Sequence, residues 1–304
     1  MKLCGLLDGA YDKLQKGEIQ ESLKELDRVL QSIWLTSTEE EWDSLVKKAC
    51  LTHPIREAAH ADPLTWRAFH QPRGYPGDAV LLDMMYFPDR VDLSDTSALG
   101  QHFCHYNVER PAVKAVRNRR KVLTRMVDEV AATVDRPKVL SVACGHLREI
   151  ELSQAAANGQ LQEYVGFDQD VDSLAEVNKR YQHLGVKTCH GSVRDFLTSK
   201  AQFEDFDLVY AAGLFDYLNE KTAKRLVACL FNILRSGGRL LIANFLPRLP
   251  DTGYMESYAG WKLIYRSEPE MQALLSEIPN RTAQNARLFT EEEGKILFLQ
   301  VEKR

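Results

Sequence analysis

Apolar positions follow one period in the first part of the chain and another in the second, and the change falls near Pro137. Before it, apolar residues recur every three or four positions over 23–33, which is the period of an amphipathic helix. Residues 38–41 have the form of a capping box, so another helix is expected there. Pro111 suits the first turn of a long helix with one apolar stripe. Residues 1–135 are therefore expected to be mainly helical.

After Pro137, short apolar runs alternate with helical patterns, which is typical of a parallel, doubly wound sheet. The short link between the last two runs predicts an antiparallel hairpin. We therefore predict an α/β fold, a Rossmann-like doubly wound seven-stranded sheet with an antiparallel last strand, over residues 136–304, with a helical lid region over residues 1–135. Strands are expected at 138–143, 164–167, 186–190, 207–212, 239–245, 282–288 and 295–302, and helices at 147–157, 171–184, 221–234 and from 267.

Composition narrows the function classes. The chain has 304 residues and a formal net charge of −4, so a surface built to hold nucleic acid is disfavoured and no nucleic-acid partner is expected. No apolar stretch approaches the ~18 residues that span a bilayer. The six cysteines are scattered without a CxxC pair, and no His, Asp or Glu spacing indicates a metal, so we expect a metal-free cytoplasmic protein.

The turn after the first predicted strand is poorly suited to a dinucleotide. A pyrophosphate-binding loop needs glycines because the backbone must approach the phosphates closely. Counted as G-x-G-x-G, its three positions are Ala143, Gly145 and Leu147, so only the middle glycine remains. Asp168 follows at the end of the second strand, where an acid holds a ribose diol. S-adenosylmethionine has a ribose, an adenine and an amino-acid tail but no phosphate, and it fits this pairing better than NAD.

From Pro137 onward the chain resembles the class I S-adenosylmethionine-dependent methyltransferases. Val139-Leu-Ser-Val-Ala-Cys-Gly145 stands in the place of the family's first motif, and Gly191-Ser-Val-Arg-Asp195 matches the third-strand segment beside the adenine. Phe206-Asp-Leu-Val-Tyr-Ala-Ala-Gly213 matches the fourth strand. Ser141 departs from the pattern, because many members carry an acid there. The resemblance implies cofactor contacts from Ala143, Cys144, Gly145, Asp168, Gln169, Ser192, Val193, Ala212 and Gly213.

A second resemblance covers more of the chain. Gly74-Tyr-Pro-Gly-Asp78, Cys144-Gly-His-Leu-Arg-Glu149, Gly213-Leu-Phe-Asp-Tyr217 and Trp261-Lys-Leu-Ile-Tyr-Arg266 are similar to segments of the bacterial extracellular-factor, 3-hydroxypalmitate methyl ester, biosynthesis methyltransferases. That branch esterifies a fatty-acid carboxylate. The resemblance implies methyl transfer to a small molecule, with O-methylation of a carboxylate by in-line displacement as the favoured case.

Polar groups on constrained turns and after the fourth strand are the candidates for the reaction itself. Tyr75, Asp78, His105 and Tyr217 are the predicted catalytic residues, with His105 or Asp78 as a base if the acceptor needs one. The structural alternatives are a simple turn at 74–78 and an exposed or structural histidine at 105, and Asp216 beside Tyr217 could cap the following helix. The predicted substrate contacts are Tyr106, Arg110, Arg117, Tyr254 and Trp261.

The basic segment 110–125 has two interpretations. Arginines and lysines over 110–125 either form a solvated helix face or turn one or two guanidinium groups inward to hold a carboxylate. Three other functions stay open: methylation of a natural-product amine or hydroxyl, methylation of a nucleic acid or protein, and cofactor binding without catalysis. A homodimer is one assembly that we consider.

Overall fold

The computed structural model describes residues 2–304, and it divides into two compact units. Unit 1 comprises the chain up to Lys114 together with Arg248–Lys262, and unit 2 comprises Ala115–Pro247 and Leu263–Arg304. These limits differ from the predicted domain ranges 1–135 and 136–304, because the last part of the long helix joins the sheet and a later segment joins the N-terminal helices. No helix in the described residues is long and apolar enough to cross a membrane.

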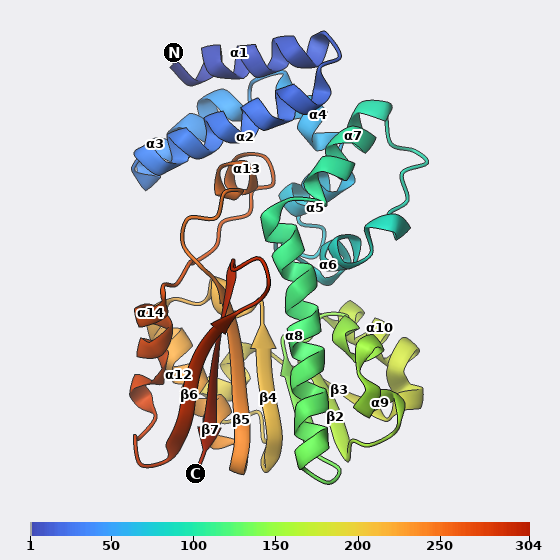
Figure 1. The fold of residues 1–304 in the computed structure, drawn as a ribbon, viewed down its shortest axis with the longest axis vertical. Helices are drawn as coiled ribbons and strands as arrows, with labels where there is room; N and C mark the ends of the chain where they lie inside the picture. The colour runs from blue at the N-terminus through green and yellow to red at the C-terminus, as the bar shows by residue number, and fades with distance from the viewer. Residues whose placement is uncertain (1) are drawn as a thin grey trace. The chain divides into compact units, whose positions relative to one another are not determined.

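Unit 2 is built on a seven-stranded sheet with the strand order β3-β2-β1-β4-β5-β7-β6 (Figure 1). The strands β1 to β5 pair in parallel, and β7 pairs antiparallel with both β5 and β6. The predicted α/β fold with an antiparallel last strand is confirmed. The strands are β1 Lys138–Val142, β2 Glu163–Asp168, β3 Val186–His190, β4 Phe206–Ala212, β5 Leu234–Phe245, β6 Ala283–Thr290 and β7 Ile296–Lys303.

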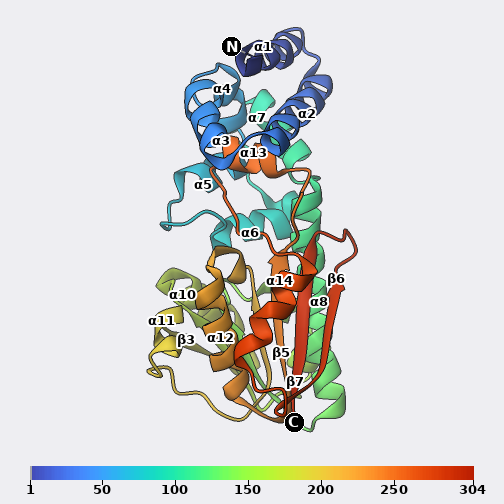
Figure 2. The same ribbon diagram turned by 90° about the vertical axis from the view of Figure 1, so that its left-hand side faces the viewer.

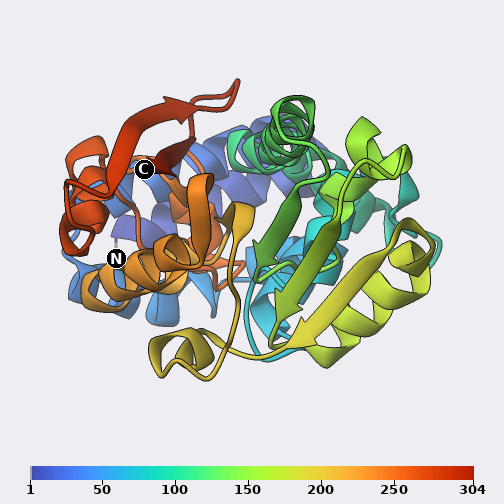
Figure 3. The same ribbon diagram turned by 90° about the horizontal axis from the view of Figure 1, so that it is seen from below.

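Helices cover both faces of this sheet, with α8 on one face and α12 on the other (Figure 3). The central strands β1 and β4 are therefore almost wholly buried, and most of their residues are apolar. The switch in strand order lies between β1 and β4, which is where open α/β sheets bind ligands. The helices are α8 Pro111–Thr133, α9 Gln154–Ala157, α10 Val171–Tyr181, α11 Val193–Leu197, α12 Glu220–Asn232 and α14 Glu268–Ala273, with short 3₁₀ turns at Arg148–Leu152, Gln182–Leu184, Phe215–Tyr217 and Leu274–Glu277.

The helix predicted over 147–157 is wrong in one respect, because it is interrupted at Ser153. A 3₁₀ turn ends there, and the Ser153 hydroxyl accepts a hydrogen bond from the amide of Ala156 at 3.1 Å to begin α9. The same hydroxyl donates to Asp128 on α8 at 2.6 Å. A serine that satisfies the first turn of a new helix cannot also continue the previous one, although the apolar spacing runs through both.

Unit 1 is helical, as predicted, and its core joins α1 and α2 through Leu7, Leu23, Leu26 and Leu30, each with no exposed surface. The predicted capping box at Thr38 is confirmed: Glu41 accepts from the Thr38 amide at 2.8 Å. The helices of unit 1 are α1 Lys2–Gln15, α2 Ile19–Thr36, α3 Glu39–Leu45, α4 Ile55–His60, α5 Pro63–His70, α6 Ala79–Tyr86, α7 Ala98–Asn107 and α13 Thr252–Ser257, with a π turn at Val46–Cys50 and a 3₁₀ turn at Pro88–Arg90.

The helix α13 lies among the N-terminal helices although it is more than 130 residues away along the chain from Lys114 (Figure 2). Gly253 permits the contact with α2: a Cβ there would stand 2.6 Å from the backbone carbon of Leu30. The side chain of Gln31 holds the segment from both sides, donating to the Leu249 carbonyl at 2.8 Å and accepting from the Gly253 amide at 3.0 Å. Segment 248–262 is thus an integral part of unit 1.

Contacts within unit 2 fix the two points at which the chain leaves it for segment 248–262 and returns to it. The amide of Ile264 donates to the Asp216 carbonyl at 2.7 Å, and the Asn244 side chain donates to the Ile264 carbonyl at 2.8 Å. Arg266 donates through its guanidinium to the carbonyls of Phe215 and Leu218. The chain therefore leaves β5 and returns to the sheet at points that are fixed beside the end of β4.

Candidate active site

The turn after β1 adopts a left-handed backbone at each of the three positions where the pattern wants glycine. The φ angles are +53° at Ala143, +52° at Gly145 and +52° at Leu147. L-residues with a Cβ pay roughly 1–2 kcal/mol for this conformation, which explains why glycine is favoured there. The turn has the left-handed φ angles of a glycine loop, although Ala143 and Leu147 carry side chains.

Asp168 at the end of β2 is the acid that organises this turn. Its Oδ2 accepts from the Gly145 amide at 2.8 Å, and its Oδ1 accepts from the Asp170 amide at 2.9 Å. The side chain is 6% exposed; burial raises its pKa, and those two amides oppose the shift. Each carboxylate oxygen keeps a further lone pair, so the group can still accept hydrogen bonds from a diol.

A cavity of about 330 Å³ opens beside the end of β3. Gln169 and Ser192, two predicted cofactor contacts, share its lining with Phe167, His190 and Phe203. Ser192 is held by Asp195, whose carboxylate accepts from its amide at 2.7 Å and from its hydroxyl at 3.1 Å. Val193 begins α11 directly after it. Phe203 was missed in the sequence, because it lies after a loop that carries no motif.

The end of β4 supplies the remaining predicted cofactor contacts. Ala212 is the last residue of the strand, and Gly213 follows with a φ of +89°. Asp216 is buried and accepts from the Phe245 amide at 2.8 Å, whereas its neighbour Tyr217 is 39% exposed. The structure therefore places the nine predicted cofactor residues at the carboxyl ends of β1 to β4, along one edge of one sheet.

A buried polar chain beneath this edge had no sequence signal. Glu149 follows the first loop, and its carboxylate accepts from Tyr210 Oη on β4 at 2.5 Å. Tyr210 in turn bonds with Tyr164 on β2, with 2.6 Å between their hydroxyl oxygens. Burial raises the pKa of Glu149, and the hydrogen bond from Tyr210 opposes this. Aromatic residues inside strands are typical core positions, so only the structure reveals their polar ends meeting.

These residues fit S-adenosylmethionine. Asp168 would hold the ribose, and Gln169 and Ser192 line a cavity next to it that would take the adenine. The turn at 143–147 has no phosphate to accommodate in this ligand, so the side chains of Ala143 and Leu147 are not an obstacle.

The predicted catalytic residues other than Tyr217 lie in unit 1. Asp78 is buried; it accepts from the Leu81 amide at 2.8 Å as the N-cap of α6 and pairs with Arg67 through both oxygens at 2.8 Å. Tyr75 is partly buried on the turn before it, and His105 is exposed on α7. The contacts of Asp78 give it a structural function, and the catalytic functions of these residues stay predictions.

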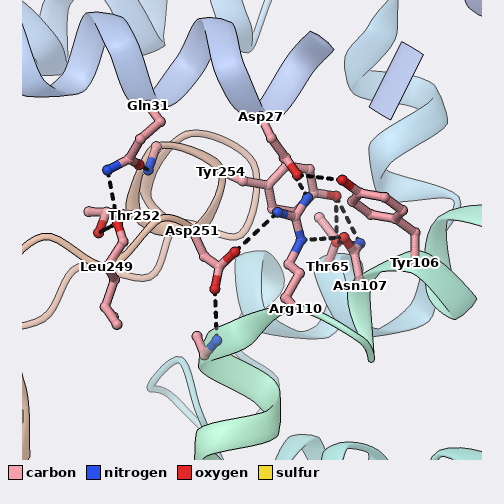
Figure 4. A network of polar contacts seen from close by, with 12 residues as sticks. Asp27, Gln31, Thr65, Tyr106, Asn107, Arg110, Leu249, Asp251, Thr252 and Tyr254 are labelled. Carbon is pink, nitrogen blue, oxygen red and sulfur yellow. Dashed lines mark hydrogen bonds and ion pairs between the residues drawn. The ribbon is translucent and has the colours of Figure 1, made fainter. Parts of the chain in front are cut away.

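Three predicted substrate contacts belong to a buried network in unit 1 (Figure 4). Arg110 pairs with Asp27 on α2 at 2.8 Å and with Asp251 beside α13 at 3.6 Å. Tyr106 donates to Asp27 at 2.9 Å, and the Tyr254 ring lies 3.9 Å from the Arg110 guanidinium carbon. Burial, together with the charge of Asp27, raises the pKa of Tyr106 to about 12.

This network holds α2, α7 and α13 together, so Tyr106, Arg110 and Tyr254 have internal partners. Trp261 is 8% exposed at the end of the same segment. Arg117 is partly buried on α8, in unit 2. The contacts of these side chains to an acceptor stay predictions. Among residues 2–304, no group of His, Cys, Asp and Glu side chains is arranged to hold a metal ion.

Residues 139–238 match the family described as methyltransferase domain. The chain is also similar to a solved structure from Bordetella parapertussis, described as a possible exported protein, with a TM-score of 0.59, 18% identity, and coverage of 74% of this chain and 79% of the other. That likeness concerns the fold. No curated protein matches the chain.

Two enzymes with bound ligands are more distant. Magnesium protoporphyrin IX methyltransferase from Synechocystis, with bound S-adenosylmethionine, has a TM-score of 0.45 and 12% identity, over 63% of this chain and 83% of its own. An N-methyltransferase from Bradyrhizobium japonicum, in complex with S-adenosylhomocysteine, has a TM-score of 0.46 and 14% identity, over 64% and 89%.

The sheet order, the acid at the end of β2 and the family match over 139–238 define the class of this protein. Unit 2 carries a class I methyltransferase domain. The protein is an S-adenosylmethionine-dependent methyltransferase, and S-adenosylmethionine is its cofactor.

Proposed function

We propose that this methyltransferase transfers the methyl group to a carboxylate oxygen of a small organic acid. The observation that carries the proposal is the state of Asp78, the predicted base on the turn with Tyr75. Both of its oxygens are engaged by Arg67, and one also caps α6. A carboxylate acceptor is already ionised at neutral pH and needs no base, whereas a hydroxyl, phenol or ammonium acceptor does.

Bound S-adenosylmethionine supplies an electrophilic methyl carbon: the acceptor oxygen bonds to it as the carbon–sulfur bond breaks, and the electron pair goes to sulfur. No proton moves when the acceptor is a carboxylate, so the products are a methyl ester and S-adenosylhomocysteine. The task of the chain is then to align the acceptor and to exclude water. Tyr217 directly follows the end of β4 and is 39% exposed, so we assign its hydroxyl to orienting the acceptor.

We assign acceptor binding and coverage of the reaction to unit 1, with Tyr75 as the contact on the turn at 74–78. Arg117 on α8 is the proposed anchor for the acceptor carboxylate, because a guanidinium binds a carboxylate through two parallel hydrogen bonds. His105 acts as a base only if the acceptor must lose a proton. The branch that makes fatty-acid methyl esters motivates fatty acids as the first acceptors to test. We expect the enzyme to work in the cytoplasm.

The test is turnover with methyl-labelled S-adenosylmethionine and three matched acceptor sets: fatty and aromatic acids, the corresponding amides and alcohols, and phenols or amines. Label in a base-labile ester of the acids alone is the expected result. Label in an amine or phenol, with none in any acid, would contradict the proposal. Tyr217→Phe is expected to raise KM for the acid more than it lowers kcat, and His105→Gln is expected to leave both unchanged.

A further inference from the structure

Arg119 lies at the ligand-binding edge of the sheet in unit 2. It projects from α8 and is 4% exposed. A Cβ at Gly213, the first residue after β4, would stand 3.0 Å from Nη1 of Arg119. β4 is the direct neighbour of β1, with Ala211 paired to Val142. The guanidinium therefore lies against the end of β4, which is the strand next to β1 and its turn 143–147.

Two other buried arginines of unit 2 have different positions. Arg148 points to α10, where it donates to Tyr181 Oη at 2.9 Å and to Glu176 at 3.1 Å. Arg266 donates to backbone carbonyls that hold the return of the chain to the sheet. These two arginines stabilise elements. The guanidinium of Arg119 has another position, against Gly213 at the end of the strand next to the cofactor turn.

The cofactor presents an anion to this region. Its methionine tail carries a carboxylate, and the turn 143–147 has side chains at two of the three glycine positions that bring backbone amides close to a ligand. A guanidinium binds a carboxylate through two parallel hydrogen bonds, and both are strongest when water is excluded. We propose that Arg119 is the residue that binds the methionine carboxylate of S-adenosylmethionine, across Gly213. The inference rests on S-adenosylmethionine as the cofactor.

Two buried carboxyl groups lie within electrostatic range of Arg119. Glu149 and Asp216 are both buried, and burial raises the pKa of each carboxyl, while the positive charge of Arg119 opposes the shift. The proposal also bears on the two interpretations of the basic segment 110–125. Arg119, like Arg110, is buried, and the carboxylate that we assign to Arg119 belongs to the cofactor.

The experiment measures the binding of a ligand with and without the carboxylate to proteins with and without the Arg119 side chain. Calorimetric titrations compare S-adenosylmethionine with decarboxylated S-adenosylmethionine, which lacks only the carboxylate, on the full chain. The proteins are wild type, Arg119→Gln, Arg119→Lys and Arg125→Gln, the last being an exposed arginine on the same helix. Wild type should bind the complete ligand about tenfold or more tightly than the decarboxylated one. Arg119→Gln should lose that preference with little change for the decarboxylated ligand, and Arg119→Lys should keep part of it.

Equal weakening of both ligands by Arg119→Gln, or an unchanged preference, would overturn the inference, because a merely structural arginine does not distinguish them. If Arg119→Gln does not fold, the comparison of wild type with Arg119→Lys decides the question in the same way. A wild type that binds both ligands equally also overturns it. A wild type that binds neither ligand overturns the cofactor assignment itself, and this result is distinct from the others. Arg125→Gln should match wild type throughout.

Discussion

The left-handed positions at Ala143 and Leu147 show that a motif can lose its glycines and keep its backbone. The φ angles at these positions match that of Gly145 within one degree. Asp168 explains how the path is retained, since its carboxylate fixes the amide of Gly145 in the middle of the turn. The left-handed conformation of the turn is therefore supported by a residue of β2. Its conformational free energy is offset by other interactions in the folded protein.

Ala143→Gly tests this cost. Removing the Cβ relieves roughly 1–2 kcal/mol of strain in the folded state and adds roughly 0.5–1 kcal/mol of chain entropy to the unfolded state. We expect the free energy of unfolding to stay the same or rise by up to about 1 kcal/mol in urea titrations. Ala228→Gly, in the right-handed backbone of α12, is the matched control and should lower it by about 1 kcal/mol. Equal losses at both sites would contradict the strain.

Asp216 should make stability depend on pH in the opposite sense to an ordinary surface acid. Burial raises its pKa to about 6, against the amide of Phe245 and the charges of Arg119 and Arg266. In the unfolded chain the same carboxyl titrates near 3.8. Between about pH 4 and pH 6 the folded state therefore holds the proton more tightly, and the contribution of Asp216 to stability falls as the pH rises through this window.

The comparison with Asp216→Asn isolates this group. The free energy of unfolding of wild type minus that of the variant should fall by roughly 2 kcal/mol from pH 4 to pH 7. Urea unfolding at unit pH intervals measures it. A difference that stays constant, or that rises with pH, would show that Asp216 is not destabilised by its burial.

Among single residues, the sequence predicted that Asp168 ends the second strand, which the structure shows, but it did not predict the groups that approach that edge of the sheet from other elements. Asp168 could be predicted because the end of a strand is visible in the apolar pattern. The closeness of Arg119 to Gly213 could not, because it depends on how α8 packs on the sheet. For Asp78 the alternative from the sequence was a simple turn, and neither its cap on α6 nor its pairing with Arg67 was predicted, because the pairing joins two helices that share no motif.

Between elements, the buried network around Arg110 decides how α2, α7 and α13 are held. Arg110→Ala leaves Asp27 and Asp251 without their partner in a buried setting, which costs about 3 kcal/mol or more. Urea unfolding should show this loss. The matched control is Arg28→Ala, since Arg28 is 69% exposed and pairs with Glu25 at 3.7 Å; it should cost less than about 1 kcal/mol.

Neutralising one acid separates the causes of that loss. If the unpaired charge is responsible, adding Asp251→Asn to Arg110→Ala should recover part of the stability. A double variant as unstable as the sum of the two single variants would point to lost packing against the Tyr254 ring instead.

The elements themselves were mostly predictable, because each strand of unit 2 is a short apolar run between turn residues. The exception at 147–157 shows the limit of spacing arguments: Ser153 ends one turn and begins the next through contacts with Asp128, which lies on another element. The spacing of apolar residues indicates which face of a helix is buried, but it does not indicate where a helix is interrupted, as it is at Ser153.

At the scale of the whole molecule, the sequence indicated a helical part followed by a sheet, and both are present. It did not indicate that 248–262 belongs with the helices. Tyr254 and Tyr258 are buried in the core of unit 1, yet in the sequence they are only aromatic residues after the fifth strand. Which core a residue joins depends on tertiary packing, and it cannot be predicted from the residues next to it in the sequence.

The discontinuity of unit 1 also bears on how the protein is made. The first 114 residues are synthesised well before segment 248–262, which completes their core. Until that segment is made, the N-terminal helices expose the apolar surface that it later covers. The sheet of unit 2 is completed later along the chain, because β7 follows β6 in the sequence and joins it to β5. The core of unit 1 can therefore be completed only after 248–262 has been made, and the pairing of β5 with β6 through β7 only after residues 296–303 have been made.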